Sequence, residues 1–262
     1  MREALLLTER ELEAAGVDTP RVDAELLLAH VLGTTRSGVY AHVDAEVPGT
    51  WRVLLRRRVE REPLAYVLGE WGFRRLVLKM DARALVPRPE TEVVVERCLE
   101  LLRGHEAPRV LDVGTGTGAI ALAIADEHPG AHVTAVDISP DAVALARENA
   151  ERLQFRVDVR TEDFDAATEG WDLVVSNPPY VTPEEWETLQ PEIRAWEPRG
   201  ALVGVGLHEQ LARAANTRWL VLEVGGCQAP DVSRTLTSLG YADVRVTPDL
   251  AGIPRVVEGR RV

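Results

Sequence analysis

Residues 110–118 read Val-Leu-Asp-Val-Gly-Thr-Gly-Thr-Gly, and this stretch decides the fold. Its first four residues have the length and β-branched content of a buried strand, and the Ala, Ile and Leu that follow predict a helix to His128. The glycines permit a tight turn, at which a ligand can approach the backbone and the free N–H groups of the helix start. The spacing is not that of a dinucleotide-binding motif, because the third glycine comes one residue early. A purely structural turn is the alternative for the motif taken alone.

Strands and helices continue to alternate after this turn. A second strand is expected from His132 to Val136, and Ser139-Pro140-Asp141 caps a helix to about Arg152. Further strands are expected at 155–159, 171–176, 219–224, 242–247 and 254–257. This order predicts an α/β fold with a doubly wound, mostly parallel seven-stranded sheet and right-handed crossovers.

The first 68 residues predict a small helical bundle, because apolar residues recur there at helical spacing. One helix starts at Thr19-Pro20, and another runs from about Thr50 until Glu62-Pro63 stops it. The residues expected on the apolar faces of the first two helices are Leu5, Leu12, Ala15, Val22, Leu26 and Ala29. Residues 69–84 predict a hairpin or extended linker, and we expect residues 85–262 to form the α/β domain.

The composition of the 262 residues indicates an ordinary globular protein, with 45% hydrophobic residues and a net charge of −12. This charge argues against a broad phosphate-neutralising surface, so no direct contact with nucleic acid is expected. The run Arg56-Arg57-Arg58 with Arg61 predicts a solvated helix face. No apolar stretch approaches the roughly 18 residues of a membrane span, and the start has no signal-peptide plan. We expect a cytoplasmic protein without a membrane partner.

Metal-binding and disulfide patterns are absent from the sequence. Cys98 and Cys227 lie far apart. The six histidines, at 30, 42, 105, 128, 132 and 208, form no Cys-His or His-Glu cluster. No bound metal and no structural disulfide are therefore expected.

The tetrapeptide Asn177-Pro178-Pro179-Tyr180 follows the expected strand 171–176 and so lies at its carboxyl end, where open α/β sheets bind ligands. The Asn side-chain oxygen and the Pro178 carbonyl can both face a planar NH₂ group. Two acceptors would hold its two hydrogens and leave the nitrogen lone pair aimed outward. Alkylation of an amide or exocyclic amino nitrogen needs this arrangement. A rigid turn after the strand is the alternative.

Acidic residues follow the next two strands. Asp137 ends the second strand, 25 residues after Asp112, where a carboxylate can accept both ribose hydroxyls of a nucleoside cofactor. An Asp that opens the turn before Ser139-Pro140 is the alternative. Asp163-Phe164, after the third strand, can contact an adenine at its rim and face, although Phe164 taken alone fits a core position as well.

Together these motifs resemble the class I S-adenosylmethionine-dependent methyltransferases, and the whole chain resembles one family among them, the peptide chain release factor glutamine N5-methyltransferases. The block Pro87-Arg-Pro-Glu-Thr-Glu92 is the most diagnostic of this family, because DNA amino-methyltransferases share Asn-Pro-Pro-Tyr but not that block. One departure is a short segment at 204–218 that lacks the family's longer helix and Pro-Gly-Gly-like turn. The resemblance rests on Pro63-Leu-Ala-Tyr66 with Gly69 and Phe73, Leu85-Val-Pro-Arg-Pro-Glu-Thr-Glu92, Asp112 to Ala119, Ala135-Val-Asp137-Ile-Ser-Pro-Asp141, Ser176-Asn-Pro-Pro-Tyr180, Glu197-Pro198, Leu222-Glu223 and Gly252 to Arg255.

The resemblance implies a Rossmann-like domain after a helical docking domain, and S-adenosyl-L-methionine as the cofactor. The implied cofactor-binding residues are Gly114, Thr115, Gly116, Thr117, Gly118, Asp137, Phe164 and Asn177. The implied catalytic residues are Asn177, Pro178 and Tyr180, and the substrate-binding residues are these three with Pro179.

The implied reaction is methyl transfer to the side-chain amide nitrogen of the glutamine in the Gly-Gly-Gln motif of release factors. It would depend on alignment rather than on a dedicated base, with the helical front docking the factor's body and the enzyme a monomer. Three alternatives are a ribosomal-protein glutamine methyltransferase, an adenine N6-methyltransferase on DNA or RNA, and a catalytically idle binding protein with the same fold.

Overall fold

The computed structural model describes residues 1–41 and 46–261, so His42 lies outside the described residues. The chain forms two compact units. The first, called here the helical unit, contains Met1–Glu70 and Leu189–Trp196, and the second, the α/β unit, contains Trp71–Thr188 and Glu197–Val262. The sequence analysis placed residues 189–196 in the α/β domain, whereas the structure groups them with the helices.

The helical unit buries one face of each of its longer helices. Leu5 and Leu12 are buried as predicted, whereas Ala15 lies just beyond the end of its helix. The face predicted for the second helix is wrong in part, because Leu27 and Leu28 are buried there and Val22 and Leu26 only half-buried. The helices are α1 (Arg2–Ala14), α2 (Pro20–Val31), α3 (Gly38–Ala41), α4 (Trp51–Val59), α5 (Leu64–Leu68) and α10 (Pro191–Trp196).

The sequence predicted a solvated helix face for the arginine run, and this prediction is wrong. Most of these arginines form ion pairs within the helical unit. Arg58 is only 6% exposed, and its Nε donates to Asp23 at 2.7 Å. Arg58 and Arg61 both bind the carboxylate of Glu192, at 2.9 and 2.5 Å. A buried guanidinium requires such carboxylate partners, and they explain why the segment 189–196 belongs to the helical unit. Arg56 alone in the run is exposed.

The α/β unit contains the predicted seven-stranded sheet, in the order β5-β4-β3-β6-β7-β9-β8. The first five strands of this order, β5-β4-β3-β6-β7, pair in parallel, and β9 is antiparallel to both β7 and β8. The third strand begins at Val157 rather than at the predicted Phe155. The strands are β3 (Arg109–Val113), β4 (His132–Asp137), β5 (Val157–Thr161), β6 (Trp171–Ser176), β7 (Thr217–Glu223), β8 (Tyr241–Pro248) and β9 (Pro254–Arg261).

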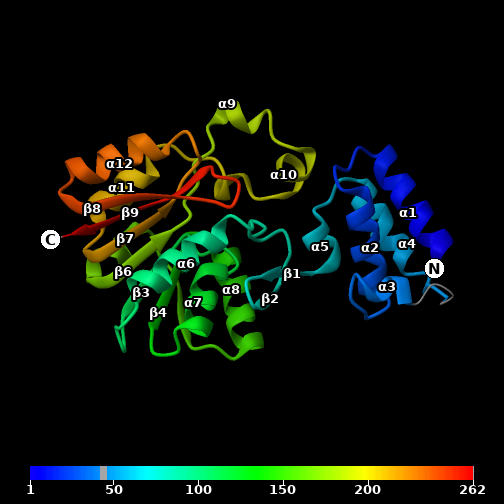
Figure 1. Ribbon diagram of the computed structural model, residues 1–262, viewed down its shortest axis with the longest axis horizontal. Helices are drawn as coiled ribbons and strands as arrows, with labels where there is room; N and C mark the ends of the chain where they lie inside the picture. Colours follow the sequence, from blue (N-terminus) through cyan, green and yellow to red (C-terminus); the bar gives the residue numbers. More distant parts are fainter. Residues whose placement is uncertain (42–45, 262) are drawn as a thin grey trace. The chain divides into compact units, whose positions relative to one another are not determined.

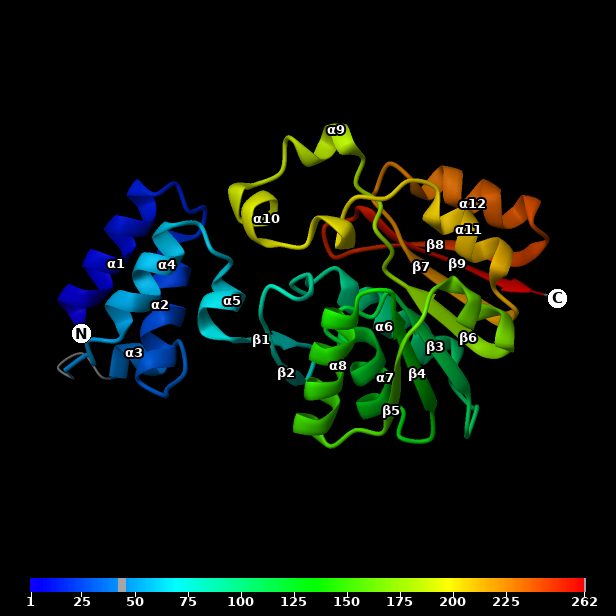
Figure 2. The same cartoon turned by 180° about the vertical axis from the view of Figure 1, so that it is seen from behind.

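Helices cover both faces of this sheet, as Figures 1 and 2 show from opposite sides. Burial on both faces explains why the central strands are nearly continuous apolar runs. One face carries α6 (Thr91–Leu101), α7 (Ala119–Glu127) and α8 (Pro140–Leu153), and the other carries α11 (Leu207–Ala214) and α12 (Ala229–Ser238). Shorter elements are η1 (Phe164–Glu169), α9 (Pro183–Trp186) and η2 (Arg199–Ala201).

A small hairpin precedes the large sheet, within the segment predicted as hairpin or linker. Its strands are β1 (Glu70–Phe73) and β2 (Leu76–Lys79). Over residues 1–41 and 46–261, no helix has both the length and the apolar character needed to cross a membrane. The same ranges contain no group of three or more His, Cys, Asp or Glu residues placed to hold a metal ion.

Candidate active site

The Gly-rich turn follows β3 and leads into α7. Gly114, Gly116 and Gly118 all have positive φ angles, of 72°, 57° and 84°, so the turn needs residues without a Cβ. A Cβ on Gly114 would meet no atom within 4 Å. Gly114 is exposed and Gly116 half-buried, whereas Thr115, Thr117 and Gly118 are buried. The open part of the predicted turn is therefore the backbone around Gly114, at the carboxyl end of β3.

Asp112 supports this turn from inside the protein. Its Oδ2 accepts hydrogen bonds from the Thr115 hydroxyl at 2.6 Å and from the Ala121 N–H at 3.2 Å. Its Oδ1 is buried and has no hydrogen-bond partner among the described residues. Burial raises the pKa of Asp112 to about 7, and the hydrogen bond from Thr115 opposes that rise.

Asp137 lies beside the turn because β4 pairs with β3, with Val136 next to Val113. Its Oδ2 accepts the Gly116 N–H and its Oδ1 the Ser139 N–H, both at 2.9 Å. Each carboxylate oxygen can accept more than one hydrogen bond, so the half-buried Asp137 can still bind hydroxyl groups.

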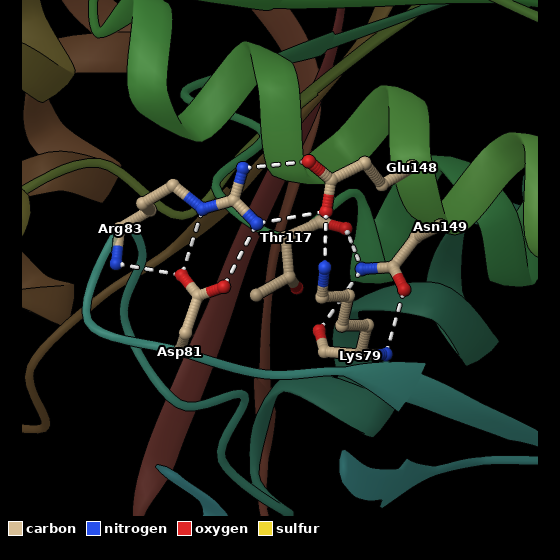
Figure 3. A network of polar contacts seen from close by, with 6 residues as sticks. All are labelled: Lys79, Asp81, Arg83, Thr117, Glu148 and Asn149. Carbon is tan, nitrogen blue, oxygen red and sulfur yellow. Dashed lines mark hydrogen bonds and ion pairs between the residues drawn. The ribbon is translucent and has the colours of Figure 1, made fainter. Parts of the chain in front are cut away.

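A polar network on α8 fastens the turn to the strand β2 (Figure 3). The fully buried Asn149 donates to the carbonyls of Thr117 and Lys79, at 3.0 and 3.2 Å, and its side-chain oxygen accepts the Lys79 N–H at 2.6 Å. Alongside it, the Arg83 guanidinium lies between the carboxylates of Asp81 and Glu148.

Phe164 begins η1, directly after β5. The Asp163 side chain accepts the Phe164 N–H, and the Glu162 N–H donates to the Asp137 carbonyl at 3.1 Å. This bond brings the start of η1 to Asp137. Phe164 is half-buried and packs against the core formed by β3, β6, α11 and α12, so part of its ring serves the core.

The tetrapeptide Asn177–Tyr180 follows β6, which pairs with β3 on the side opposite to β4. The Ser176 hydroxyl donates to the Val113 carbonyl at 2.7 Å, which fixes the ends of the two strands together. The predicted residues Gly114 and Asn177 thus follow β3 and β6, and Asp137 ends β4, so all three lie at the carboxyl ends of neighbouring strands.

Asn177 has a defined orientation. Its Nδ2 donates to the Thr91 hydroxyl oxygen at 3.4 Å, so its Oδ1 is the atom left to accept other hydrogen bonds. Pro178 has no N–H and is buried, and the rest of the tetrapeptide is half-buried.

Tyr180 is held through both its backbone and its side chain. Its carbonyl accepts the Gln228 side-chain N–H at 2.9 Å, and its ring stacks on His208 with centroids 6.4 Å apart. Its hydroxyl donates to Glu223 Oε1 at 3.5 Å. Burial, with the nearby Glu223 charge, raises the pKa of Tyr180 to about 12. Tyr180 is therefore a neutral donor at neutral pH.

The shortened segment after Val203 still packs against the tetrapeptide. The Val181 N–H donates to the Leu202 carbonyl at 2.9 Å, and a Cβ on Gly204 would lie only 2.7 Å from the Pro179 carbonyl oxygen. The short helix α11 then supplies His208 to the Tyr180 ring. The departure from the family pattern at 204–218 is thus compatible with an ordered site.

The diagnostic block 87–92 lies against the same loops. Arg88 forms an ion pair with the buried Glu197 at 2.6 Å, and Thr91 begins α6 next to Asn177. The sequence analysis assigned no role to Thr91, Glu223 or Gln228. Thr91 and Glu223 both lie in motifs that carry the family resemblance, which gave a signal for them, whereas Gln228 had none.

The fold and the site define a Rossmann-like class I methyltransferase. Residues 92–210 match the Methyltransferase small domain and residues 3–69 the PrmC N-terminal domain. Two relatives called release factor glutamine methyltransferase show which family this is. The protein of Deinococcus radiodurans is 42% identical over 100% of this chain and 98% of its own, and that of Chlorobaculum tepidum 41% over 91% and 90%. The chain belongs to the release factor glutamine methyltransferase family.

Two solved structures resemble the chain at low sequence identity and indicate the fold alone. The hMettl16 catalytic domain, in complex with a 3′UTR hairpin, has a TM-score of 0.57 at 16% identity and covers 83% of this chain and 85% of its own. The human methyltransferase 10 domain containing protein has a TM-score of 0.52 at 18% identity, covering 70% and 88%.

Proposed function

We propose that the protein transfers the methyl group of S-adenosylmethionine to the side-chain amide nitrogen of the glutamine in the Gly-Gly-Gln motif of peptide chain release factors. The observation that carries this proposal is the orientation of Asn177, whose Nδ2 is turned to Thr91 so that its Oδ1 is left to accept. The names of the relatives, release factor glutamine methyltransferase, support a release factor glutamine as the substrate.

The residues around the Gly-rich turn fit S-adenosylmethionine. The remaining acceptor sites of the half-buried Asp137 suit a molecule with a ribose diol. The open space at Gly114 leaves room for it, and Phe164 offers the exposed part of its ring to the adenine. The cofactor supplies an electrophilic methyl group on a sulfonium. Asn177, directly after β6, is the last of the proposed cofactor-binding residues.

The substrate amide is held by the tetrapeptide. The Asn177 Oδ1 and the Pro178 carbonyl accept its two hydrogens, and Pro179 and Tyr180 flank its plane. An amide nitrogen is a poor nucleophile, so the rate comes mainly from in-line alignment, an effect that can contribute several kcal/mol. The nitrogen becomes strongly acidic as the new bond forms, so water can take its proton.

The helical unit docks the body of the factor, and the enzyme acts as a cytoplasmic monomer without nucleic acid. The net charge of −12 supports a protein rather than a nucleic-acid substrate. If docking provides most of the binding energy, a free Gly-Gly-Gln peptide is a much poorer substrate than the intact factor.

The test is mass spectrometry of a release factor incubated with the protein and isotopically labelled S-adenosylmethionine. One added methyl group on the Gly-Gly-Gln glutamine is expected, with none on a factor whose glutamine is replaced by Ala. Ribosomal proteins and adenine-containing DNA serve as competing acceptors. Faster labelling of either would overturn the proposed substrate.

A further inference from the structure

We propose that the turn between β8 and β9, residues 249–253, is a docking surface for the part of the release factor that surrounds the substrate glutamine. Its two large apolar side chains, Leu250 and Ile253, bind apolar side chains of the factor. This inference rests on the proposed function and adds to it a contact outside both the tetrapeptide and the helical unit.

The turn presents apolar side chains to solvent. Leu250 is 104% exposed, more than any other large apolar side chain among the described residues, and Ile253 is 46% exposed. A fully exposed side chain contributes no packing to the fold, so the core does not explain Leu250. Single exposed leucines are common on protein surfaces, so the rigidity and the position of the turn decide whether Leu250 has a role.

A buried carboxylate holds the turn from inside. Asp249 is only 9% exposed, and its Oδ1 accepts the N–H groups of Ala251 and Ile253, both at 3.0 Å. Its Oδ2 accepts from the Arg255 guanidinium at 3.2 Å, and its own N–H donates to the Ile253 carbonyl at 2.8 Å. A turn that is fixed in advance loses little conformational entropy when a partner binds. Leu250 is therefore presented on a rigid support.

The turn lies at the same edge of the sheet as the tetrapeptide. Strand β9 is antiparallel to β7, with Val256 beside Glu223, so the start of β9 lies at the carboxyl end of β7. The Val224 N–H donates to the Arg255 carbonyl at 2.9 Å and extends this pairing. The turn that precedes β9 is thus next to the loop that follows β7.

That loop connects the turn to Tyr180. A Cβ on Gly226 would lie only 2.6 Å from Ile253 Cγ2, so the turn packs directly against the loop. A Cβ on the neighbouring Gly225 would lie 3.6 Å from the Tyr180 ring. The Gln228 side chain accepts the Gly225 N–H at 3.1 Å and donates to the Tyr180 carbonyl at 2.9 Å. The loop at 225–226 therefore contacts Ile253 on one side and the residue that flanks the substrate amide on the other.

The position of the turn determines which molecule it meets. A substrate glutamine held by Asn177 and Tyr180 has the chain of the factor attached to it on both sides, and this chain has to pass the loops around the tetrapeptide. The only charged side chain of the turn, Asp249, is buried against Arg255. The turn therefore fits an apolar segment of the factor next to the glutamine, and offers no free charge to a phosphate or a basic segment.

The first experiment measures methyl transfer to the intact factor by Leu250→Ala and Leu250→Glu. Burial of a leucine side chain corresponds to about tenfold or more in affinity, so Leu250→Ala should raise KM about tenfold and Leu250→Glu should raise it further. The loss should lie in KM rather than in kcat, because the contact is the same before and during methyl transfer. Val77→Ala, at an exposed apolar residue of β2, is the matched control and should keep the KM of the wild type.

The second experiment identifies the occupant of the turn by photo-cross-linking. Leu250→benzoylphenylalanine, a photoreactive variant, should cross-link to the factor close to its Gly-Gly-Gln motif, and Val77→benzoylphenylalanine should not. Mass spectrometry of the product locates the cross-link. A product that contains two copies of this chain and no factor would show that the turn is a dimer interface, and would overturn the proposal.

These outcomes separate the docking role from the proposed function. A wild type that methylates no release factor refutes the function. If the wild type methylates the factor, an unchanged KM in both Leu250 variants refutes the docking role alone, and so does the absence of a cross-link from position 250 to the factor. Leu250 is fully exposed, so these substitutions leave the folded protein intact, and circular dichroism checks this.

Discussion

Replacing Asp112 by Asn should stabilise the protein increasingly as the pH rises. Burial raises the pKa of this carboxyl from 3.8 to about 7. The unfolded chain therefore releases the proton at a lower pH than the native protein does. Stability contributed by the protonated form is complete below pH 4 and is lost as the pH passes through about 7.

The size of the effect follows from the difference between the two pKa values. About three pKa units correspond to an upper bound of about 4 kcal/mol at pH 8. An Asn side chain keeps an oxygen that can accept from Thr115 and Ala121, so these bonds can survive the change. Other carboxyls, Glu223 included, titrate in both proteins and cancel in the difference.

The assay is denaturant unfolding of both proteins without cofactor, at several values between pH 4 and pH 8. The free energy of unfolding of the variant minus that of the wild type should increase through this range. A difference that stays constant with pH would show that Asp112 is ionised in the native protein and would refute the reasoning.

Three further predictions concern the cofactor, the substrate and the helical unit. Asp137→Ala removes an acceptor for two hydroxyls, each worth about 1.5–3 kcal/mol, so calorimetry should show much weaker S-adenosylmethionine binding, and unchanged affinity would refute the ribose assignment. Asn177→Ala should bind the cofactor yet lose most methyl transfer in the mass-spectrometric assay; a rate near that of the wild type would contradict its role. Arg58→Met leaves Asp23 without its buried partner and should lower the free energy of unfolding by about 3–5 kcal/mol in urea, more than Arg56→Met at the exposed neighbour.

The sheet and the loops that follow its strands could be predicted from the sequence. The strand 171–176 and the turn at 114–118 could be placed because a short apolar run and closely spaced glycines determine the local backbone by themselves. The burial and the ion pairs of Arg58 could not be predicted, because its partners Asp23 and Glu192 are distant in sequence. A run of charges has the same local pattern whether it is solvated or paired.

The residues that hold the loops of the site in place could not be predicted, for a similar reason. Thr91 is an ordinary residue for a helix start, and nothing local indicates that it contacts Asn177, 86 residues away. Asn149 likewise has the local pattern of a polar residue within a helix, yet it is fully buried and binds the strand β2 and the Gly-rich turn. Such roles depend on how α6, α8 and β6 are brought together.

The grouping of residues 189–196 with the first helices has a consequence for synthesis of the protein. Chains emerge from the ribosome amino end first, and domains generally fold as they emerge. Most of the helical unit is translated first, but the ion-pair partner of Arg61, Glu192, lies 131 residues further along the chain. Until α10 has been translated, the buried guanidinium of Arg58 lacks one of its two carboxylates. The amino-terminal unit is therefore completed late, after most of the strands of the other unit already exist.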